Sequence, residues 1–257
     1  MPDLSPRFPL APTVPVEGTD YPAGTVLSVL DGYLSDERRA RIEAVVAART
    51  FSVVPVLEGL VDAGNVNAVL RSAEGLGCGA AHLVALGGGA ARLAEATLDP
   101  DGDPDEALAG SRRVAARASQ GADKWLELTA YPDVASYLEA VRELGYRVAV
   151  TALRAEARPI ASYDFSRPTA LVVGNEQAGV SEALLDAADD ALLLPLDGFV
   201  QSYNVSVAAA LALYHARADR TARGGHGDLS GDERRVLTAH YVARAVPHAA
   251  ALLRHAA

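Results

Sequence analysis

The sequence predicts an α/β protein built on a mostly parallel sheet with helices on both faces. From residue 52 onwards, short and almost wholly apolar runs alternate with segments of helical hydrophobic periodicity. This alternation is typical of parallel strands that are buried on both faces. The chain has 257 residues, 50% of them hydrophobic and 22% charged. It can therefore bury a sizeable core, and disorder of the bulk of the chain is excluded.

The predicted strands and helices follow one another as repeated strand and helix units. We expect strands at residues 52–57, 81–86, 125–129, 147–153, 169–174 and 191–196. We expect helices at residues 66–76, 106–118, 134–144, 181–188 and 205–218. Helices between successive strands are what parallel pairing requires, because the chain must cross back over the sheet.

The two ends of the chain differ in composition from this central part. Residues 1–34 include a proline-rich stretch without periodicity, which predicts an extended arm or a disordered tail. Residues 35–218 form the predicted main domain, opening with a charged helix at 35–49 that Ser35 caps. Residues 219–257 carry more arginine than acid and show a helical pattern from 230 to 253, which predicts a basic C-terminal extension.

Charge, hydropathy and cysteine content limit the classes of function. The 23 basic and 33 acidic residues give a net charge of −10, which is not the usual balance of a nucleic-acid-binding protein. No apolar run approaches the roughly 18 residues that a membrane span needs, so we expect no contact with a membrane. Without a signal-peptide pattern, and with Cys78 as the single cysteine, a cytoplasmic location is expected.

Glycines at positions 75, 77 and 79 look like a dinucleotide-binding turn, but their position argues against that function. Such a turn follows a strand and opens a helix, whereas these glycines close the helix predicted at 66–76. We therefore expect them to cap the end of that helix. The histidines near the C-terminus lack the spacing of a zinc site, so no metal site is predicted.

Three other segments, residues 64–71, 170–179 and 194–206, concentrate polar residues beside predicted strand ends, where open α/β sheets bind ligands. Asn65 and Asn204 are also plausible as helix caps. In this order, however, the segments resemble motifs 1, 2 and 3 of the SpoU/TrmH family of RNA ribose 2′-O-methyltransferases, in the SPOUT superfamily. The resemblance extends from about Ser35 to Arg217, and Lys124-Trp125 has the spacing of the transfer-RNA guanosine branch.

The resemblance implies a fold, a reaction and partners. The C-terminal part of the sheet would form a deep trefoil knot of the SPOUT type. The enzyme would be a homodimer that transfers a methyl group from S-adenosylmethionine to RNA, with transfer RNA favoured over ribosomal RNA. A ribosomal target, including a methylation that confers antibiotic resistance, and a catalytically idle RNA-binding module are the alternatives. The target nucleotide is left open.

The resemblance also implies roles for individual residues. The catalytic set is Asn65, Arg71, Glu176, Ser202 and Asn204. The residues expected to bind the methyl donor are Thr151, Gly174, Leu194 and Tyr203, the last standing where the family usually has leucine. Arg71 is either the base or a clamp for phosphate, because an arginine stays protonated near neutral pH. From the distribution of charge, RNA is expected to contact Arg38, Arg41, Arg112, Arg113 and Lys124.

Overall fold

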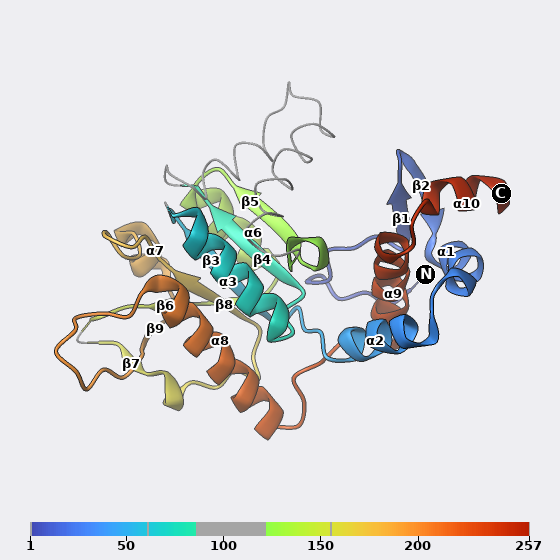
Figure 1. Ribbon diagram of the computed structural model, residues 1–257. Helices are drawn as coiled ribbons and strands as arrows, with labels where there is room; N and C mark the ends of the chain where they lie inside the picture. Colours follow the sequence, from blue (N-terminus) through green and yellow to red (C-terminus); the bar gives the residue numbers. More distant parts are fainter. Residues whose placement is uncertain (1, 61, 86–121, 155, 257) are drawn as a thin grey trace. The chain divides into compact units, whose positions relative to one another are not determined.

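The computed structural model describes residues 2–60, 62–85, 122–154 and 156–256. The chain divides into two compact units (Figure 1). The terminal unit consists of residues 1–50 and 227–257, and the central unit of residues 51–226. The predicted borders lay after residues 34 and 218, whereas the observed ones lie after residues 50 and 226. They differ because the two ends of the chain fold with each other instead of forming an arm and an extension.

The central unit contains a seven-stranded sheet whose described strand pairs are all parallel. Its strands are β3 (Val53–Glu58), β4 (Ala80–Val84), β5 (Glu127–Tyr131), β6 (Arg147–Thr151), β7 (Arg158–Pro159), β8 (Thr169–Val173) and β9 (Asp190–Leu193). Their order across the sheet is β5-β4-β3-β8-β6-β9-β7. The predicted α/β class with a mostly parallel sheet is confirmed, and β7 is an addition to the six predicted strands.

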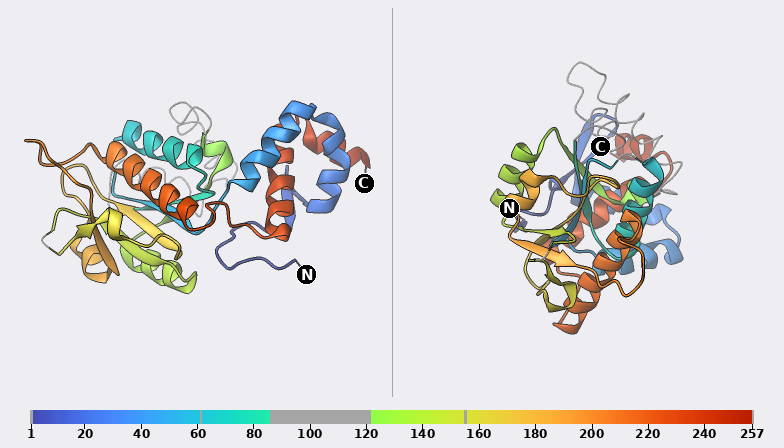
Figure 2. Two further views of the ribbon diagram at one scale, coloured as in Figure 1. Left: turned by 90° about the horizontal axis from the view of Figure 1, so that it is seen from below. Right: turned by 90° about the vertical axis from the view of Figure 1, so that its left-hand side faces the viewer.

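Helices cover both faces of this sheet. On one face, α3 (Ala63–Gly75) lies beside α8 (Val205–Ala222), and on the other α6 (Val134–Glu143) lies beside α7 (Glu182–Ala187) (Figure 2). Val69 and Leu70 of α3 pack with Ala209 of α8 over Leu57 of β3 in one apolar cluster. The helix predicted at 106–118 lies outside the described residues.

The glycines after α3 cap the helix, as predicted. Gly77 has a φ of +90°, a conformation that glycine adopts without steric cost. The Cys78 amide donates to the carbonyl of Ala73 at 3.0 Å, which closes the last turn. A phosphate-binding role for this turn is thereby excluded, since its amides face the helix end.

The terminal unit is built from both ends of the chain. It comprises a hairpin of β1 (Thr13–Val16) and β2 (Thr19–Pro22) with the helices α1 (Ala23–Leu30), α2 (Asp36–Ala47), α9 (Gly231–Ala245) and α10 (Ala249–Ala256). Helix α9 packs against α1 and α2. The prediction of an extended arm over 1–34 is wrong, because Glu17 and Gly18 turn the chain with positive φ and Phe8, Val14 and Tyr21 are buried.

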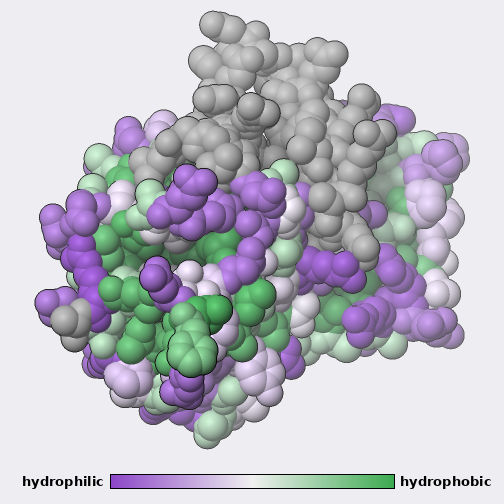
Figure 3. Space-filling view, turned by 60° about the vertical axis from the view of Figure 1, so that its left-hand side comes forward, coloured by the Kyte–Doolittle hydropathy of each residue, from purple (hydrophilic) through white to green (hydrophobic). Residues whose placement is uncertain are grey.

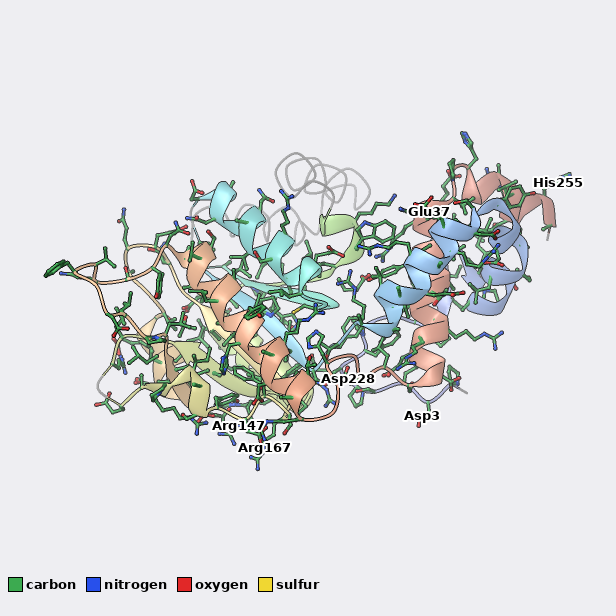
Figure 4. The ribbon with its side chains drawn as sticks, turned by 60° about the horizontal axis from the view of Figure 1, so that its bottom comes forward. Asp3, Glu37, Arg147, Arg167, Asp228 and His255 are labelled. Carbon is green, nitrogen blue, oxygen red and sulfur yellow. The ribbon has the colours of Figure 1, made fainter. Side chains whose placement is uncertain are left out.

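Even the first residues are tied to this unit. The Asp3 amide donates to the Asp232 carboxylate at 2.9 Å and the Ser5 amide to Glu233 at 2.8 Å, so the start of the chain lies against the start of α9 (Figure 4). The single helix predicted at 230–253 is interrupted, because Pro247 cannot continue a helix and His248 has a φ of 57°. Among the described helices none is long and apolar enough to span a bilayer.

His82 of β4 is buried within a cluster of tyrosine rings. Its ring centroid lies 5.3 Å from that of Tyr131, 6.1 Å from Tyr137 and 6.3 Å from Tyr146. Burial strips water from the imidazole and lowers the pKa of His82 to about 4, because the charged form loses its hydration.

This burial predicts a loss of stability in mild acid. The unfolded chain takes up a proton on His82 below about pH 6.5, whereas the folded chain does so only near pH 4. The free energy of unfolding should therefore fall by about 2 kcal/mol between pH 7.5 and pH 5 on account of His82. Urea denaturation of the wild type and of His82→Phe at both pH values tests this. An equal pH dependence in the two proteins would contradict it.

Candidate active site

A pocket of about 610 Å³ opens at the carboxyl ends of β6, β8 and β9. Its wall includes all four residues predicted to bind the methyl donor, namely Thr151, Gly174, Leu194 and Tyr203. Glu176, Ser202 and Asn204 of the predicted catalytic set line it as well. Pockets of roughly 300 to 1,000 Å³ hold cofactor-sized ligands, so this one has room for a nucleoside cofactor.

The segment after β8 folds into a tight turn that forms one wall of the pocket. The backbones of Asn175 and Gly179 bond to each other in both directions at 2.9 Å. The Asn175 side-chain oxygen accepts from the amides of Gln177 and Ala178, also at 2.9 Å. A Cβ on Gly174 would lie 2.3 Å from the Gly179 backbone. The turn therefore requires glycine at position 174 for its own closure.

Gly174→Ala should consequently distort this turn. Overpacking of this kind costs about 1 to 3 kcal/mol of folding free energy, and we expect the donor to bind much more weakly. Gly198→Ala is the matched control, since a Cβ there meets no atom within 4 Å and the position also lies on a pocket loop. Thermal unfolding and calorimetric titration of both variants check this expectation. It fails if Gly174→Ala behaves like Gly198→Ala in both measurements.

The end of β3 holds the same turn in place. Glu58 is fully buried, and its carboxylate accepts from the Ser181 amide at 2.9 Å and from the Ser181 hydroxyl. The Asn175 side-chain amide donates to the Gly59 carbonyl at 2.8 Å. Glu58 was not among the residues predicted from the sequence, although an acid at the end of an otherwise apolar buried strand is itself unusual.

Side chains from all three motif segments meet beside the pocket. The side-chain nitrogen of Asn65 donates to the Glu176 carboxylate at 3.0 Å. The side-chain oxygen of Asn65 accepts from the side-chain nitrogen of Asn204 at 3.2 Å. The Asp62 amide also reaches Glu176, at 3.4 Å. A carboxylate and two carboxamides are thus aligned in fixed donor and acceptor roles, with Asn65 at the centre.

Local helix capping explains why Asn65 is available for this cluster. Asp62, and not Asn65, caps α3. The Asp62 carboxylate accepts a hydrogen bond from the backbone N–H of Asn65 at 2.7 Å, which leaves the Asn65 side chain free of the cap. Asn204 does cap α8, where its oxygen accepts from the Ser206 amide at 2.9 Å. Because the oxygen of Asn204 serves the cap, its nitrogen is left to face Asn65.

The loop between β9 and α8 completes the pocket mouth. The Tyr203 hydroxyl donates to the Pro195 carbonyl at 3.0 Å and so joins the two ends of the loop. Phe199 and Val200 at its tip are exposed, as is Leu153 after β6. Figure 3 shows apolar side chains gathered within a hydrophilic rim on the face that carries this loop.

The predicted basic residues are not all brought to this site. Arg71 is exposed on α3 and does not line the pocket. Lys124 is exposed in the turn η2 (Ala122–Trp125), which packs against α3, and its ammonium lies 5.2 Å from the Trp125 ring centroid. Arg38 and Arg41 are exposed on α2 of the terminal unit. Arg112 and Arg113 lie outside the described residues.

A pocket at the carboxyl edge of a parallel sheet, with polar groups converging beside it, is the construction of an α/β enzyme that uses a bound small molecule. Comparison with known proteins shows which family of such enzymes the chain resembles. Residues 104–214 match the family described as the SpoU rRNA Methylase family. The tRNA (guanosine(18)-2′-O)-methyltransferase of Thermus thermophilus is 35% identical over 190 residues, which are 74% of this chain and 87% of that protein. The chain belongs to the SpoU/TrmH family of RNA methyltransferases.

Further relatives agree with this assignment. The Escherichia coli protein of the same name as the Thermus enzyme is 28% identical over 74% of each chain. Among solved structures, the A. aeolicus TrmH/SpoU tRNA modifying enzyme superposes with a TM-score of 0.66 at 23% identity, over 85% of this chain and 99% of that one. The methyltransferase AviRb from Streptomyces viridochromogenes, in complex with AdoMet, has a TM-score of 0.51 at 25% identity over 66% and 60%.

Proposed function

We propose that the protein methylates the ribose 2′-hydroxyl of a guanosine in transfer RNA, with S-adenosylmethionine as the methyl donor. The observation that carries this proposal is the cluster of Asn65, Glu176 and Asn204 at the mouth of the donor-sized pocket. Relatives named for guanosine 18 of tRNA, at 24 to 35% identity, support the substrate. S-adenosylmethionine supplies a methyl group activated by its sulfonium.

The residues of this chain supply binding and orientation. The backbone-rich walls at Gly174 and Leu194 suit an adenosine group, and Leu192 and Tyr203 provide apolar surface for its base. Glu176, oriented by Asn65, would offer a negative charge to the sulfonium of a donor bound in the pocket. Arg71 and Ser202 bind the acceptor phosphate, and this grip places the 2′-hydroxyl for attack. Among the described residues no three acidic, histidine or cysteine side chains are grouped to bind a metal.

Site-specific methylation of a defined transcript tests this function. Unmodified tRNA should accept one methyl group from labelled S-adenosylmethionine, in the presence of a chelator. A transcript with adenosine in place of guanosine 18 should not be methylated, and nuclease mapping should find the 2′-O-methyl group at that guanosine. Methylation of ribosomal RNA fragments alone would favour the ribosomal alternative. Donor binding without methylation of either RNA would favour an idle RNA-binding module.

We further propose that the enzyme is an obligate homodimer that pairs through α8. One face of this helix packs in the core, but Val207, Leu211 and Tyr214 on the other face are 46%, 42% and 64% exposed. Their spacing of four and three residues makes them one apolar stripe along the helix. A stripe of this kind is typical of a surface that a second protein covers.

The expected result for Leu211→Arg is therefore a monomer with little activity, because a charge cannot be buried in an apolar interface without a partner. Sedimentation velocity at micromolar concentration measures the state. Glu143→Arg, at an exposed position of α6 on the opposite face of the sheet, is the control and should stay dimeric. A wild-type protein that is monomeric and active would contradict the dimer.

The trefoil knot and the RNA surface complete the proposal. The insertion of β8 between β3 and β6 is compatible with a knotted C-terminal part, as the family resemblance implies. Lys124 lies on the turn beside α3, the helix that carries Asn65 and Arg71, and we propose it as a phosphate contact. Arg38 and Arg41 add positive charge from the terminal unit, and Arg112 and Arg113 are proposed from their sequence positions. The cytoplasm, where transfer RNA is found, is the proposed location.

A further inference from the structure

Two charged side chains at the rim of the pocket form an ion pair that the reaction described above does not use. Arg154 follows β6, and Glu182 is the first residue of α7. The Arg154 guanidinium lies 2.7 Å from the Glu182 carboxylate, and both residues line the pocket. Their side chains are 37% and 80% exposed, so the pair is accessible to a ligand in the pocket.

These two residues account for most of the charge around the pocket. Among the described residues that line it, Arg154 is the only cation, and the anions are Glu176 and Glu182. Glu176 accepts a hydrogen bond from the Asn65 side chain and so belongs to the polar cluster of Asn65, Glu176 and Asn204. Most of the remaining wall is apolar side chain or loop backbone, including Leu185, Leu192 and Leu196.

One part of the methyl donor needs charged partners, which the apolar part of the wall does not offer. Its adenine and ribose are neutral, but its methionyl end is a zwitterion with a carboxylate and an ammonium group. A carboxylate that enters the pocket finds its one described cationic partner in Arg154, whose planar guanidinium can bind both oxygens. An ammonium group next to it finds Glu182.

We propose that Arg154 and Glu182 form the subsite for the amino-acid end of the donor, with the carboxylate on Arg154 and the ammonium on Glu182. This assignment rests on the proposed function. Exchange of partners is easy because an exposed ion pair contributes little to stability, and because each side chain gains an opposite charge for the one it releases. The pair thus keeps the subsite ordered before the donor arrives.

Three nucleosides that differ only at this end provide the test: S-adenosylhomocysteine, its deaminated analogue, and 5′-methylthioadenosine, which lacks the amino-acid end. Each is titrated calorimetrically into the full-length wild type, Arg154→Ala and Glu182→Gln. Arg154→Ala should weaken S-adenosylhomocysteine about tenfold or more, as for a charged hydrogen bond, and leave methylthioadenosine unchanged. Glu182→Gln should weaken S-adenosylhomocysteine but leave the deaminated analogue equally or more tightly bound, because Glu182 no longer competes for Arg154.

Arg158→Ala is the matched control. Arg158 forms a similar ion pair with Asp190 at 2.7 Å and is 44% exposed, yet it does not line the pocket. It should bind all three nucleosides like the wild type. Equal affinity of Arg154→Ala and wild type for S-adenosylhomocysteine would overturn the subsite while leaving the proposed function intact. A wild type that binds none of the three nucleosides would instead overturn the proposed function.

Discussion

Arg71→Ala is expected to lower kcat by a factor of about 10² to 10⁴, the range that a positioned catalytic group contributes, without changing donor affinity. Arg71 is exposed on α3, outside the pocket wall, while Asn65 on the same helix reaches the pocket cluster. The side chain is therefore placed for the acceptor and not for the donor. Its removal should affect the step that needs RNA.

The measurement is single-turnover methylation of tRNA beside calorimetric binding of S-adenosylhomocysteine. Arg71→Lys should also be poor, because an ammonium group cannot reproduce a planar, bidentate grip on phosphate. Arg142→Ala is the control and should keep wild-type turnover. It removes an exposed arginine of α6 whose guanidinium donates to the Ala187 carbonyl and which does not line the pocket. Near-normal methylation by Arg71→Ala would exclude both the base and the clamp role.

Asn65→Asp is expected to be nearly inactive at pH 8 and to recover part of its activity as the pH falls. The substitution replaces the nitrogen that donates to Glu176 at 3.0 Å with a second carboxylate oxygen. Two carboxylates at this separation repel each other, which raises the pKa of one of them. Protonation at lower pH then restores a donor between the two oxygens, so the ratio of variant to wild-type activity should rise.

Asn65→Ala separates this electrostatic effect from a simple loss of contact. It removes both hydrogen bonds of the Asn65 side chain without adding a charge, so its activity relative to wild type should be low and independent of pH. The comparison requires pH profiles of kcat/KM from about pH 6 to 8.5 for the three proteins. Parallel profiles for Asn65→Asp and Asn65→Ala would mean that Asn65 and Glu176 are not coupled in the working enzyme.

Local pattern predicted the central unit well, because its elements carry their own signals. The apolar run of β3 and the glycine after α3 each follow from neighbouring residues. The terminal unit could not be predicted in this way. The strand β1, which holds the buried Val14, packs against α9, more than 200 positions along the chain, and a proline-rich stretch gives no sign of such a partner.

The residues of the candidate site were predicted, but the hydrogen bonds that join them were not. Asn65, Glu176 and Asn204 were identified through the family resemblance, yet their shared hydrogen bonds depend on Asp62 taking over the cap of α3. Glu58 and Arg154 were missed, because each is a single charged residue at the end of a strand. Only the folded structure shows that Glu58 accepts from Ser181 and that Arg154 pairs with Glu182, both at the start of α7.

The construction of the terminal unit from both chain ends affects how the protein is made. Helices α1 and α2 are synthesised before the central unit, but their partner α9 begins only at residue 231. These amino-terminal helices therefore keep apolar side chains such as Val26 and Leu30 uncovered until α9 has been synthesised. The central unit, contiguous from 51 to 226, can fold during that interval. A nascent chain that stalls before α9 should accordingly expose its amino-terminal helices to chaperones while its sheet is already formed.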